Sequence, residues 1–196
     1  MLAFIFAVTL LILTPGPGVL STAGLGAAYG FNAGLQYVVG LFLGNNLVAI
    51  IVVSGLATIL FTIPYARTVL LALSVCYLVY LAAKIALAGS KISFISATKK
   101  PGIRAGIFLQ IINPKAYVVN TTLFTGFIFF PQSLITETLI KFLILNLVWV
   151  PIHLLWLWIG SKIQEMNLPA KAQFRVNLIM AIAMLSVVGL AIFSMV

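Results

Sequence analysis

Apolar runs fill almost the whole chain, and they restrict what it can fold into more than any other feature of the sequence. A membrane-spanning helix needs about 20 largely apolar residues, and the runs that reach this length are 2–28, 35–62, 67–88, 104–130, 137–160 and 175–196. With 63% apolar and 7% charged residues among 196, the sequence predicts an all-α membrane protein with six transmembrane helices. The longest connection, near 89–103, leaves no room for a soluble catalytic domain, so we do not expect an enzyme.

The first apolar run is interrupted at Thr14–Gly18, where the sequence reads Thr-Pro-Gly-Pro-Gly. Each proline removes a backbone donor and clashes with the preceding turn, and each glycine loosens the backbone. A regular helix therefore cannot continue through Pro15, Gly16 and Pro17. Backbone groups left unpaired in hydrocarbon cost several kcal/mol each, so such a break is tolerated only where it is buried in protein or lines a wet cavity. The interruption is a candidate site.

A second interruption, Asn113-Pro114-Lys115, comes about 98 residues later, half the chain length away, in the fourth apolar run. Paired breaks in the two halves of a chain indicate a transporter's binding site, because half-helix ends meet the solute there. The sequence therefore predicts one transporter domain, 1–196, made of two inverted three-helix halves, approximately 1–88 and 104–196, joined by a basic loop, 89–103. The first and fourth helices are expected to be broken near mid-membrane.

The net charge of +9 comes mainly from residues that flank the apolar runs. Basic residues in short loops mark the cytoplasmic side, whereas a nucleic-acid site needs a basic face on a folded domain. One side carries Lys84, Lys91, Lys99, Lys100, Arg104, Lys162, Lys171 and Arg175. The other carries Arg67 and Lys141, and Lys115 lies within a run. We therefore predict a multi-pass protein in contact with membrane lipid, with both termini outside the cytoplasm and no nucleic-acid partner.

Polar side chains within the apolar runs need partners, because an amide left unpaired in hydrocarbon is costly. Asn45 and Asn46 lie together near the middle of the second run, and two roles stay open for them: lining the solute pathway or hydrogen-bonding a neighbouring helix. Beyond the second break, a further polar set recurs at intervals of three or four and is expected to share one helix face, turned to the bundle interior. This set is Asn113, Tyr117, Asn120 and Thr121.

Titratable residues are few in the fifth run. His153 has no second metal ligand nearby, and both a hydrogen-bonded structural role and a role in a proton relay stay open for it. Glu137 and Lys141, spaced i,i+4, are expected to form a surface ion pair.

The lone Cys76 has no partner for a disulfide or a cysteine metal site within one chain. We therefore expect neither a metal nor a cofactor.

The order and spacing of several motifs resemble the LysE/RhtB family of amino-acid exporters over almost the full length of the chain. The motifs are Pro15-Gly16-Pro17 in the first helix, Gly30, Gly34, Gly40 and Gly44 at the entry to the second, Tyr77-Leu78 and Tyr80-Leu81 in the third, Asn113-Pro114-Lys115 in the fourth, and Phe130 with Gln132 at its end. Each is weakly specific alone, and the ordered set is specific. The resemblance implies export of amino acids or related small metabolites across a bacterial inner membrane, driven by the proton gradient.

The chain departs from that family in its fifth helix. Members often have an acidic residue there, where this chain has Asn146, Trp149 and His153 and no carboxylate. His153 is the nearest titratable substitute. The coupling ion therefore stays open at the level of the sequence.

From these residues we expect a secondary transporter that exports a small neutral or zwitterionic amino acid. The positive ends of the broken half-helices, together with Lys115, would hold the substrate carboxylate. Amide groups would add neutral hydrogen bonds, and the scarcity of buried acids argues against a cationic substrate. The predicted substrate-binding set is Pro15, Gly16, Pro17, Asn45, Asn113, Pro114, Lys115 and Asn120.

Two other functions stay open. An inorganic-ion exporter of the same superfamily would need carboxylate, imidazole or thiolate ligands, and the spans contain few. In a non-transporting membrane scaffold, both breaks would only kink their helices and Lys115 would reach to the membrane interface. The sequence also leaves a homodimer open.

Overall fold

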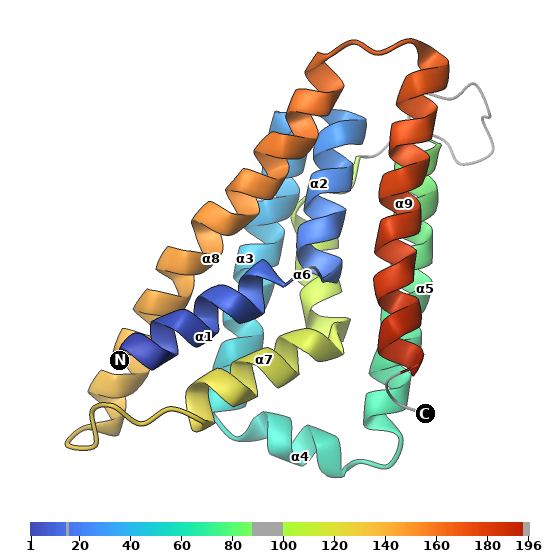
Figure 1. Ribbon diagram of the computed structural model, residues 1–196. Helices are drawn as coiled ribbons and strands as arrows, with labels where there is room; N and C mark the ends of the chain where they lie inside the picture. The colour runs from blue at the N-terminus through green and yellow to red at the C-terminus, as the bar shows by residue number, and fades with distance from the viewer. Residues whose placement is uncertain (15, 88–99, 194–196) are drawn as a thin grey trace.

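Nine helices and no strand make up the part of the chain that the computed structural model describes, residues 1–14, 16–87 and 100–193 (Figure 1). The helices are α1 (Leu2–Leu13), α2 (Pro17–Tyr29), α3 (Phe31–Val53), α4 (Leu56–Thr62), α5 (Ala66–Ala86), α6 (Ile103–Ile112), α7 (Pro114–Thr125), α8 (Leu134–Glu165) and α9 (Ala170–Phe193). Pro15 and most of the predicted basic loop, with Lys91 and Lys99, lie outside the described residues. The all-α prediction is confirmed.

Three described helices are long and apolar enough to cross a membrane. They are α3, the Thr68–Ala86 part of α5, and α8, with mean hydropathies of 1.9, 2.1 and 2.0. α1 and α2 make a fourth candidate span when they are counted as one bent helix. The arrangement as six spans in two inverted halves stays a prediction.

Both predicted interruptions separate two helices. α1 ends at Leu13 and α2 begins at Pro17, with a bend of 51° between them. α6 ends at Ile112 and α7 begins at Pro114, and Asn113 between them is extended, with φ −80° and ψ 107°. In both cases a proline is the first residue of the new helix, where its missing N–H removes no helical hydrogen bond.

The second apolar run, 35–62, is not one helix. α3 ends at Val53 and α4 begins at Leu56. Gly55 between them has φ +79°, a left-handed conformation that favours glycine and commonly ends a helix. The apolar composition continues through this point, so hydrophobicity alone did not locate the end of α3.

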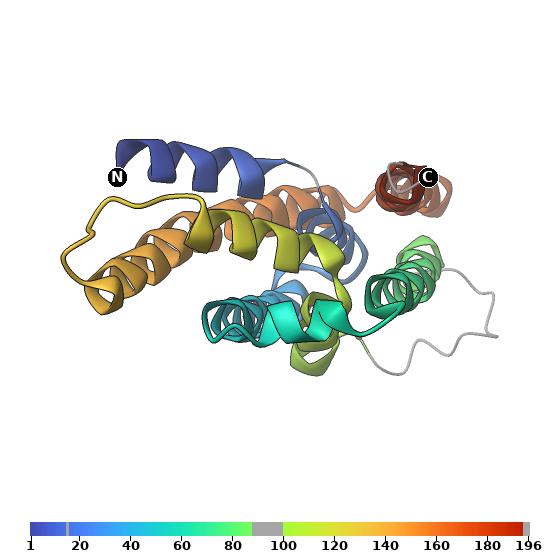
Figure 2. The same cartoon turned by 90° about the horizontal axis from the view of Figure 1, so that it is seen from below.

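The central helix α2 packs against α8, α3, α5 and α9 (Figure 1). The closest approaches are made by glycines. A Cβ atom on Gly160 of α8 would collide with the backbone of Ala23 in α2, and one on Gly106 of α6 would collide with the backbone of α3 at Tyr37. Small residues allow membrane helices to approach this closely, so α2–α8 and α3–α6 form the tightest packed pairs. Seen from below, α1 and α7 run side by side across the molecule, while α5 and α9 are seen almost end-on (Figure 2).

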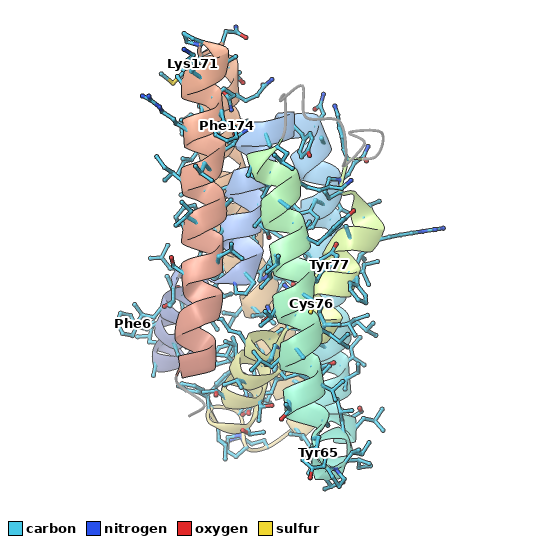
Figure 3. All side chains as sticks on the ribbon, turned by 90° about the vertical axis from the view of Figure 1, so that its right-hand side faces the viewer. Phe6, Tyr65, Cys76, Tyr77, Lys171 and Phe174 are labelled. Atoms are coloured by element: carbon cyan, nitrogen blue, oxygen red, sulfur yellow. The ribbon has the colours of Figure 1, made fainter. Side chains whose placement is uncertain are left out.

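Large apolar side chains cover the outer surface. Phe6 of α1, Phe174 of α9 and Tyr65 before α5 are exposed and point outward (Figure 3). Large apolar side chains are also exposed along α3, α5, α8 and α9, as on a surface that faces lipid. The composition and the surface therefore agree on a membrane environment.

Basic residues gather at one end of the molecule. The carboxyl ends of α5 and α8 and the amino end of α9 lie at that end (Figure 1). These segments carry Lys84, Lys162, Lys171 and Arg175. The clustering agrees with the predicted cytoplasmic side, and the orientation of the termini stays a prediction.

Candidate functional site

Lys115 joins the two interrupted helices. It is the second residue of α7, and its Nζ donates a hydrogen bond of 2.9 Å to the backbone oxygen of Thr14, which caps the carboxyl end of α1. The carboxyl end of a helix has unpaired carbonyl groups and a partial negative charge, so a cation is stabilised there. The two breaks, far apart in sequence, therefore lie together in space.

Gly16 makes room for this lysine. A Cβ atom on Gly16 would lie 2.9 Å from Nζ and 3.1 Å from Cδ of Lys115. A side chain at this position would have to displace the lysine from the carbonyl of Thr14. The Pro-Gly-Pro element therefore both ends α1 and leaves space for a cation from the other half of the chain.

Asn113 caps the amino end of α7. Its Oδ1 accepts a hydrogen bond of 3.1 Å from the backbone N–H of Lys115, and its Nδ2 donates to Oε1 of Gln110 at 3.5 Å. Asparagine is a preferred residue at this helix position for this reason. The backbone amide of Lys115 is therefore already occupied, and at this break the lysine ammonium is the donor left for an anion.

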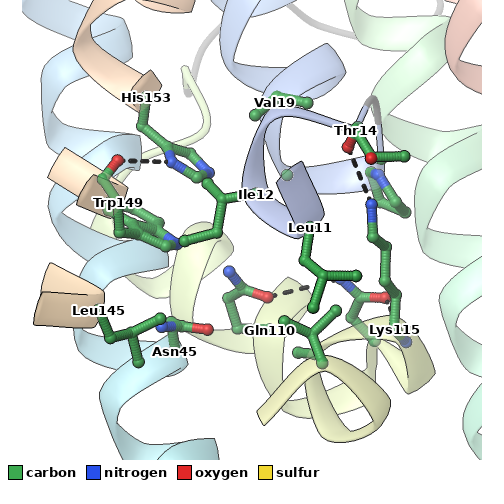
Figure 4. Close-up of a pocket in the computed structure, with 16 residues that line it drawn as sticks. Leu11, Ile12, Thr14, Val19, Asn45, Gln110, Lys115, Leu145, Trp149 and His153 are labelled. Carbon is green, nitrogen blue, oxygen red and sulfur yellow. Dashed lines mark hydrogen bonds between the residues drawn. The ribbon is translucent and has the colours of Figure 1, made fainter. Parts of the chain in front are cut away.

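A pocket of about 60 Å³ lies beside the breaks, with walls from α1, α2, α3, α6, α7 and α8 (Figure 4). The predicted residues that line it are Gly16, Pro17, Asn45, Asn113, Lys115 and His153. The rest of the wall is mostly apolar and includes Leu11, Ile12, Val19, Val119 and Leu145. A few polar groups in an apolar wall are typical of small-molecule sites. Among the described residues, no three His, Cys, Asp or Glu side chains are grouped as a metal site requires.

Asn120 supports Asn45 from behind the pocket. Its Nδ2 donates to Oδ1 of Asn45 at 3.2 Å and to the backbone oxygen of Ala116 at 2.8 Å. Because a carbonyl only accepts, the bond to Ala116 fixes the orientation of the Asn120 amide, and Oδ1 of Asn45 faces it. Nδ2 of Asn45 is buried and has no hydrogen-bond partner within the described ranges. Unpartnered buried amides are rare in folded proteins, so Asn45 has a spare donor at the pocket wall.

His153 and Trp149 form the α8 side of the pocket. The two rings are stacked, with centroids 3.5 Å apart and planes 12° apart, and Nδ1 of His153 lies 3.0 Å from the backbone oxygen of Trp149 (Figure 4). The carbonyl only accepts, so Nδ1 carries the hydrogen. Nε2 is on the opposite side of the ring, 3.5 Å from where a Cβ of Gly18 would lie. The hydrogen-bonded structural role of His153 is therefore present, and its proton-relay role stays a prediction.

A family model described as the LysE type translocator matches residues 9–196. The chain belongs to this family. The matched region contains both helix breaks and every residue of the pocket.

Relatives of this LysE-type translocator are named leucine efflux proteins. One, from Klebsiella pneumoniae subsp. pneumoniae, is 26% identical over 132 residues, which cover 65% of this chain and 62% of the relative. Another, from Salmonella choleraesuis, is 29% identical over 123 residues, covering 60% of this chain and 58% of the relative. The matches thus span less than two thirds of either relative. No solved structure matches the chain.

Two predicted site residues of the translocator do not line the pocket. Pro114 begins α7, and Asn120 acts through its hydrogen bond to Asn45. A third, Pro15, lies outside the described residues. The remaining predicted residues are brought together in one pocket.

The predicted polar face of α7 is correct except at its end. Asn113, Tyr117 and Asn120 are buried, whereas Thr121 is exposed. Each residue turns a helix by about 100°, so the buried face continues from Asn120 to Leu123, which is fully buried. Thr121 is rotated away from it.

Most of the apolar wall was not predicted, and neither were two pocket residues with polar or aromatic side chains, Gln110 and Trp149. Gln110 lies one turn before Asn113, and Trp149 lies one turn before His153, so both share a face with a residue that was predicted. The helical spacing was the available signal. Asn46, by contrast, is not a pocket residue: its side-chain amide exchanges two hydrogen bonds with that of Asn146, at 3.0 and 2.9 Å.

The predicted surface pair of Glu137 and Lys141 is buried instead. The two side chains are 5% and 3% exposed, and Nζ lies 2.7 Å from Oε1. Glu137 Oε2 also accepts from the backbone N–H groups of Phe129 and Phe130, at 2.9 and 2.6 Å, and Lys141 donates to the backbone oxygen of Phe124 at 2.9 Å. The connection from α7 to α8 folds over the pair, and the i,i+4 spacing does not reveal such a cover.

Proposed function

We propose that this LysE-type translocator is a secondary transporter that exports a small neutral or zwitterionic amino acid, or a related metabolite, from the bacterial cytoplasm. The proton gradient drives the export. The observation that carries the proposal is the position of Lys115, whose ammonium reaches from one broken helix to the other at the wall of a pocket. The relatives are named leucine efflux proteins, which supports the same class of solute.

The substrate carboxylate is assigned to the Lys115 ammonium. A carboxylate makes a stronger, charge-assisted hydrogen bond with Nζ than the neutral carbonyl of Thr14 does. Asn45 and Gln110 supply neutral amide groups, and the apolar wall receives the substrate side chain. No acidic residue lines the pocket, so the side chain of a basic amino acid has no partner there.

The size of the pocket fits a small solute. One water molecule needs about 10–15 Å³ of cavity volume. The pocket volume of 60 Å³ therefore holds several water-sized groups. That is close to the number of non-hydrogen atoms in the smallest amino acids. A solute as large as leucine therefore requires the apolar wall to move outward when it binds.

Six spans in two inverted halves, 1–88 and 104–196, suit this function. We assign α1 with α2, α3 and α5 to the first half, and α6 with α7, α8 and α9 to the second. Two contacts support the symmetry: Lys115 meets Thr14, 101 residues away, and Asn46 meets Asn146, 100 residues away. Equivalent positions of inverted repeats meet near their two-fold axis. With the basic end cytoplasmic, both termini are external.

Flux from reconstituted lipid vesicles tests the proposal. Vesicles loaded with labelled L-leucine and diluted into a more acidic buffer are expected to release leucine faster than protein-free vesicles, because protons entering drive the amino acid out. L-Lysine is expected to leave at the protein-free rate. Release of a panel of neutral amino acids at the protein-free rate, with either sign of the gradient, would contradict export. Equal release of lysine would contradict the substrate class.

A further inference from the structure

The second ring nitrogen of His153 is an unused acceptor in the pocket. Nδ1 donates its hydrogen to the Trp149 carbonyl, so in the neutral imidazole Nε2 holds a lone pair. No hydrogen bond joins Nε2 to a protein group in the part of the chain described. The nearest turn of α2 leaves it open, because Gly18 has no side chain and a Cβ there would come within 3.5 Å of Nε2.

The charges around the pocket are unbalanced. Lys115 is the fixed cation among the lining residues, and these include no aspartate or glutamate. His153 and Lys115 reach the pocket from α8 and α7, and lie on opposite sides of the view in Figure 4. A zwitterion whose carboxylate meets Lys115 presents its ammonium group to the remaining wall. Nε2 of neutral His153 is an acceptor suited to that ammonium.

We propose that Nε2 of His153 is the coupling site, where the substrate ammonium and the transported proton compete for one lone pair. The inference rests on the proposed export function. Neutral His153 accepts a hydrogen bond from the ammonium. A proton on Nε2 occupies the lone pair and makes the ring a cation, so the substrate ammonium loses this acceptor and is repelled by the charged ring. Binding of the proton and of the amino acid is mutually exclusive.

Mutual exclusion at one atom produces exchange. The amino acid leaves the external face with its ammonium intact, and a proton from the external solution binds the freed lone pair of Nε2. That proton leaves to the cytoplasm before the next amino acid binds. Each cycle moves one proton inward and one neutral zwitterion outward, and therefore one net positive charge inward.

The other titratable groups around α8 do not share this position. Among the helices packed against α8, α1 has none, and the tyrosines of α2, α3 and α7, namely Tyr29, Tyr37 and Tyr117, do not line the pocket. The remaining ionisable residues of α8 are Glu137, Lys141, Lys162 and Glu165, which lie outside the pocket. Among the residues that line the pocket, Lys115 is the other group that carries a charge.

Two substitutions distinguish the hydrogen bond of His153 Nδ1 to the Trp149 carbonyl from the acceptor function of Nε2. In His153→Asn, the amide nitrogen replaces Nδ1 and keeps the bond to the Trp149 carbonyl, but nothing replaces Nε2. In His153→Gln, the longer side chain places an oxygen acceptor, which does not titrate, near the position of Nε2. Binding of labelled L-leucine to the purified protein is measured for each from about pH 8 to about pH 3.5, a range that covers the titration of a buried imidazole as well as of an exposed one.

Wild-type protein is expected to bind L-leucine at the alkaline end of the range. Below the pH at which the imidazole titrates, its affinity for L-leucine should fall about tenfold for each pH unit, because the proton and the amino acid exclude each other. His153→Gln should bind with no dependence on pH, and its vesicles should exchange leucine for leucine but no longer respond to a pH gradient. His153→Asn should bind about tenfold or more weakly at every pH.

The outcomes distinguish this inference from the export function. If wild-type protein binds L-leucine equally at all pH values, the exclusion at His153 is wrong and the export function stands. If His153→Asn binds as wild type does, the histidine serves only the bond to Trp149, and the inference is again wrong. If leucine and other neutral amino acids bind at no pH, the export function itself fails.

Discussion

Replacing Lys115 by glutamine is expected to weaken L-leucine binding by at least about thirtyfold and to reduce vesicle release to nearly the protein-free rate. Removing one member of a desolvated charge pair costs about 2–5 kcal/mol, and 1.4 kcal/mol is a factor of ten. Glutamine keeps much of the length of the side chain but has no charge for the carboxylate. Equilibrium binding and flux on the same preparation measure both effects.

The matched control is Lys162→Gln. Lys162 also belongs to a helix and also donates to an oxygen, Oε2 of Glu165 at 2.6 Å, but this pair is about half exposed. Exposed pairs contribute at most about 1 kcal/mol and touch no substrate here, so binding and flux should remain at wild-type values. If the Lys115→Gln variant transports as fast as the control, Lys115 only caps α1 and does not bind the substrate.

Replacing Glu137 by glutamine is expected to lower the free energy of unfolding and the denaturant concentration at the unfolding midpoint, because the Lys141 ammonium is left without its partner. Oε1 of Glu137 pairs with Lys141, and Oε2 accepts two backbone N–H groups from the α7–α8 connection. In the variant, an amide nitrogen must face either the Lys141 ammonium or those N–H groups. Denaturant unfolding in detergent, followed by circular dichroism, measures the loss.

Glu165→Gln is the control for this second prediction. Its carboxylate is 55% exposed in the pair with Lys162, so the free energy of unfolding should change by less than about 1 kcal/mol. If Glu137→Gln unfolds at the same denaturant concentration as this control, the Glu137–Lys141 pair is solvated in the membrane protein and the connection between α7 and α8 does not cover it.

The helix breaks could be predicted because their causes are local. Proline cannot continue a helix in any environment, so Pro17 and Pro114 begin new helices here as the sequence indicated. The half-chain spacing of the two breaks then suggested that they meet, and the contact of Lys115 with Thr14 joins them. Local chemistry, combined with the spacing of the two breaks, was enough to gather most of the candidate site.

Other features depend on contacts that the sequence does not specify. Asn45 and Asn46 are adjacent and chemically identical, and their different roles follow from partners on α7 and α8, Asn120 and Asn146. The burial of Glu137 depends on a connection that folds over it. Gly55 ends α3 within an apolar run by its left-handed conformation. In each case tertiary contacts or backbone conformation decided what residue type and spacing left open.

The pocket between the two helix breaks is proposed to hold the substrate, and a structure of the protein with bound L-leucine tests this most directly. Density for leucine is expected in the pocket, with the carboxylate on Nζ of Lys115, the ammonium on Nε2 of His153 and the side chain against Ile12 and Leu145. Lys115 should then have exchanged the carbonyl of Thr14 for the carboxylate. Leucine bound elsewhere, with the pocket empty and the Lys115–Thr14 hydrogen bond unchanged, would contradict the claim.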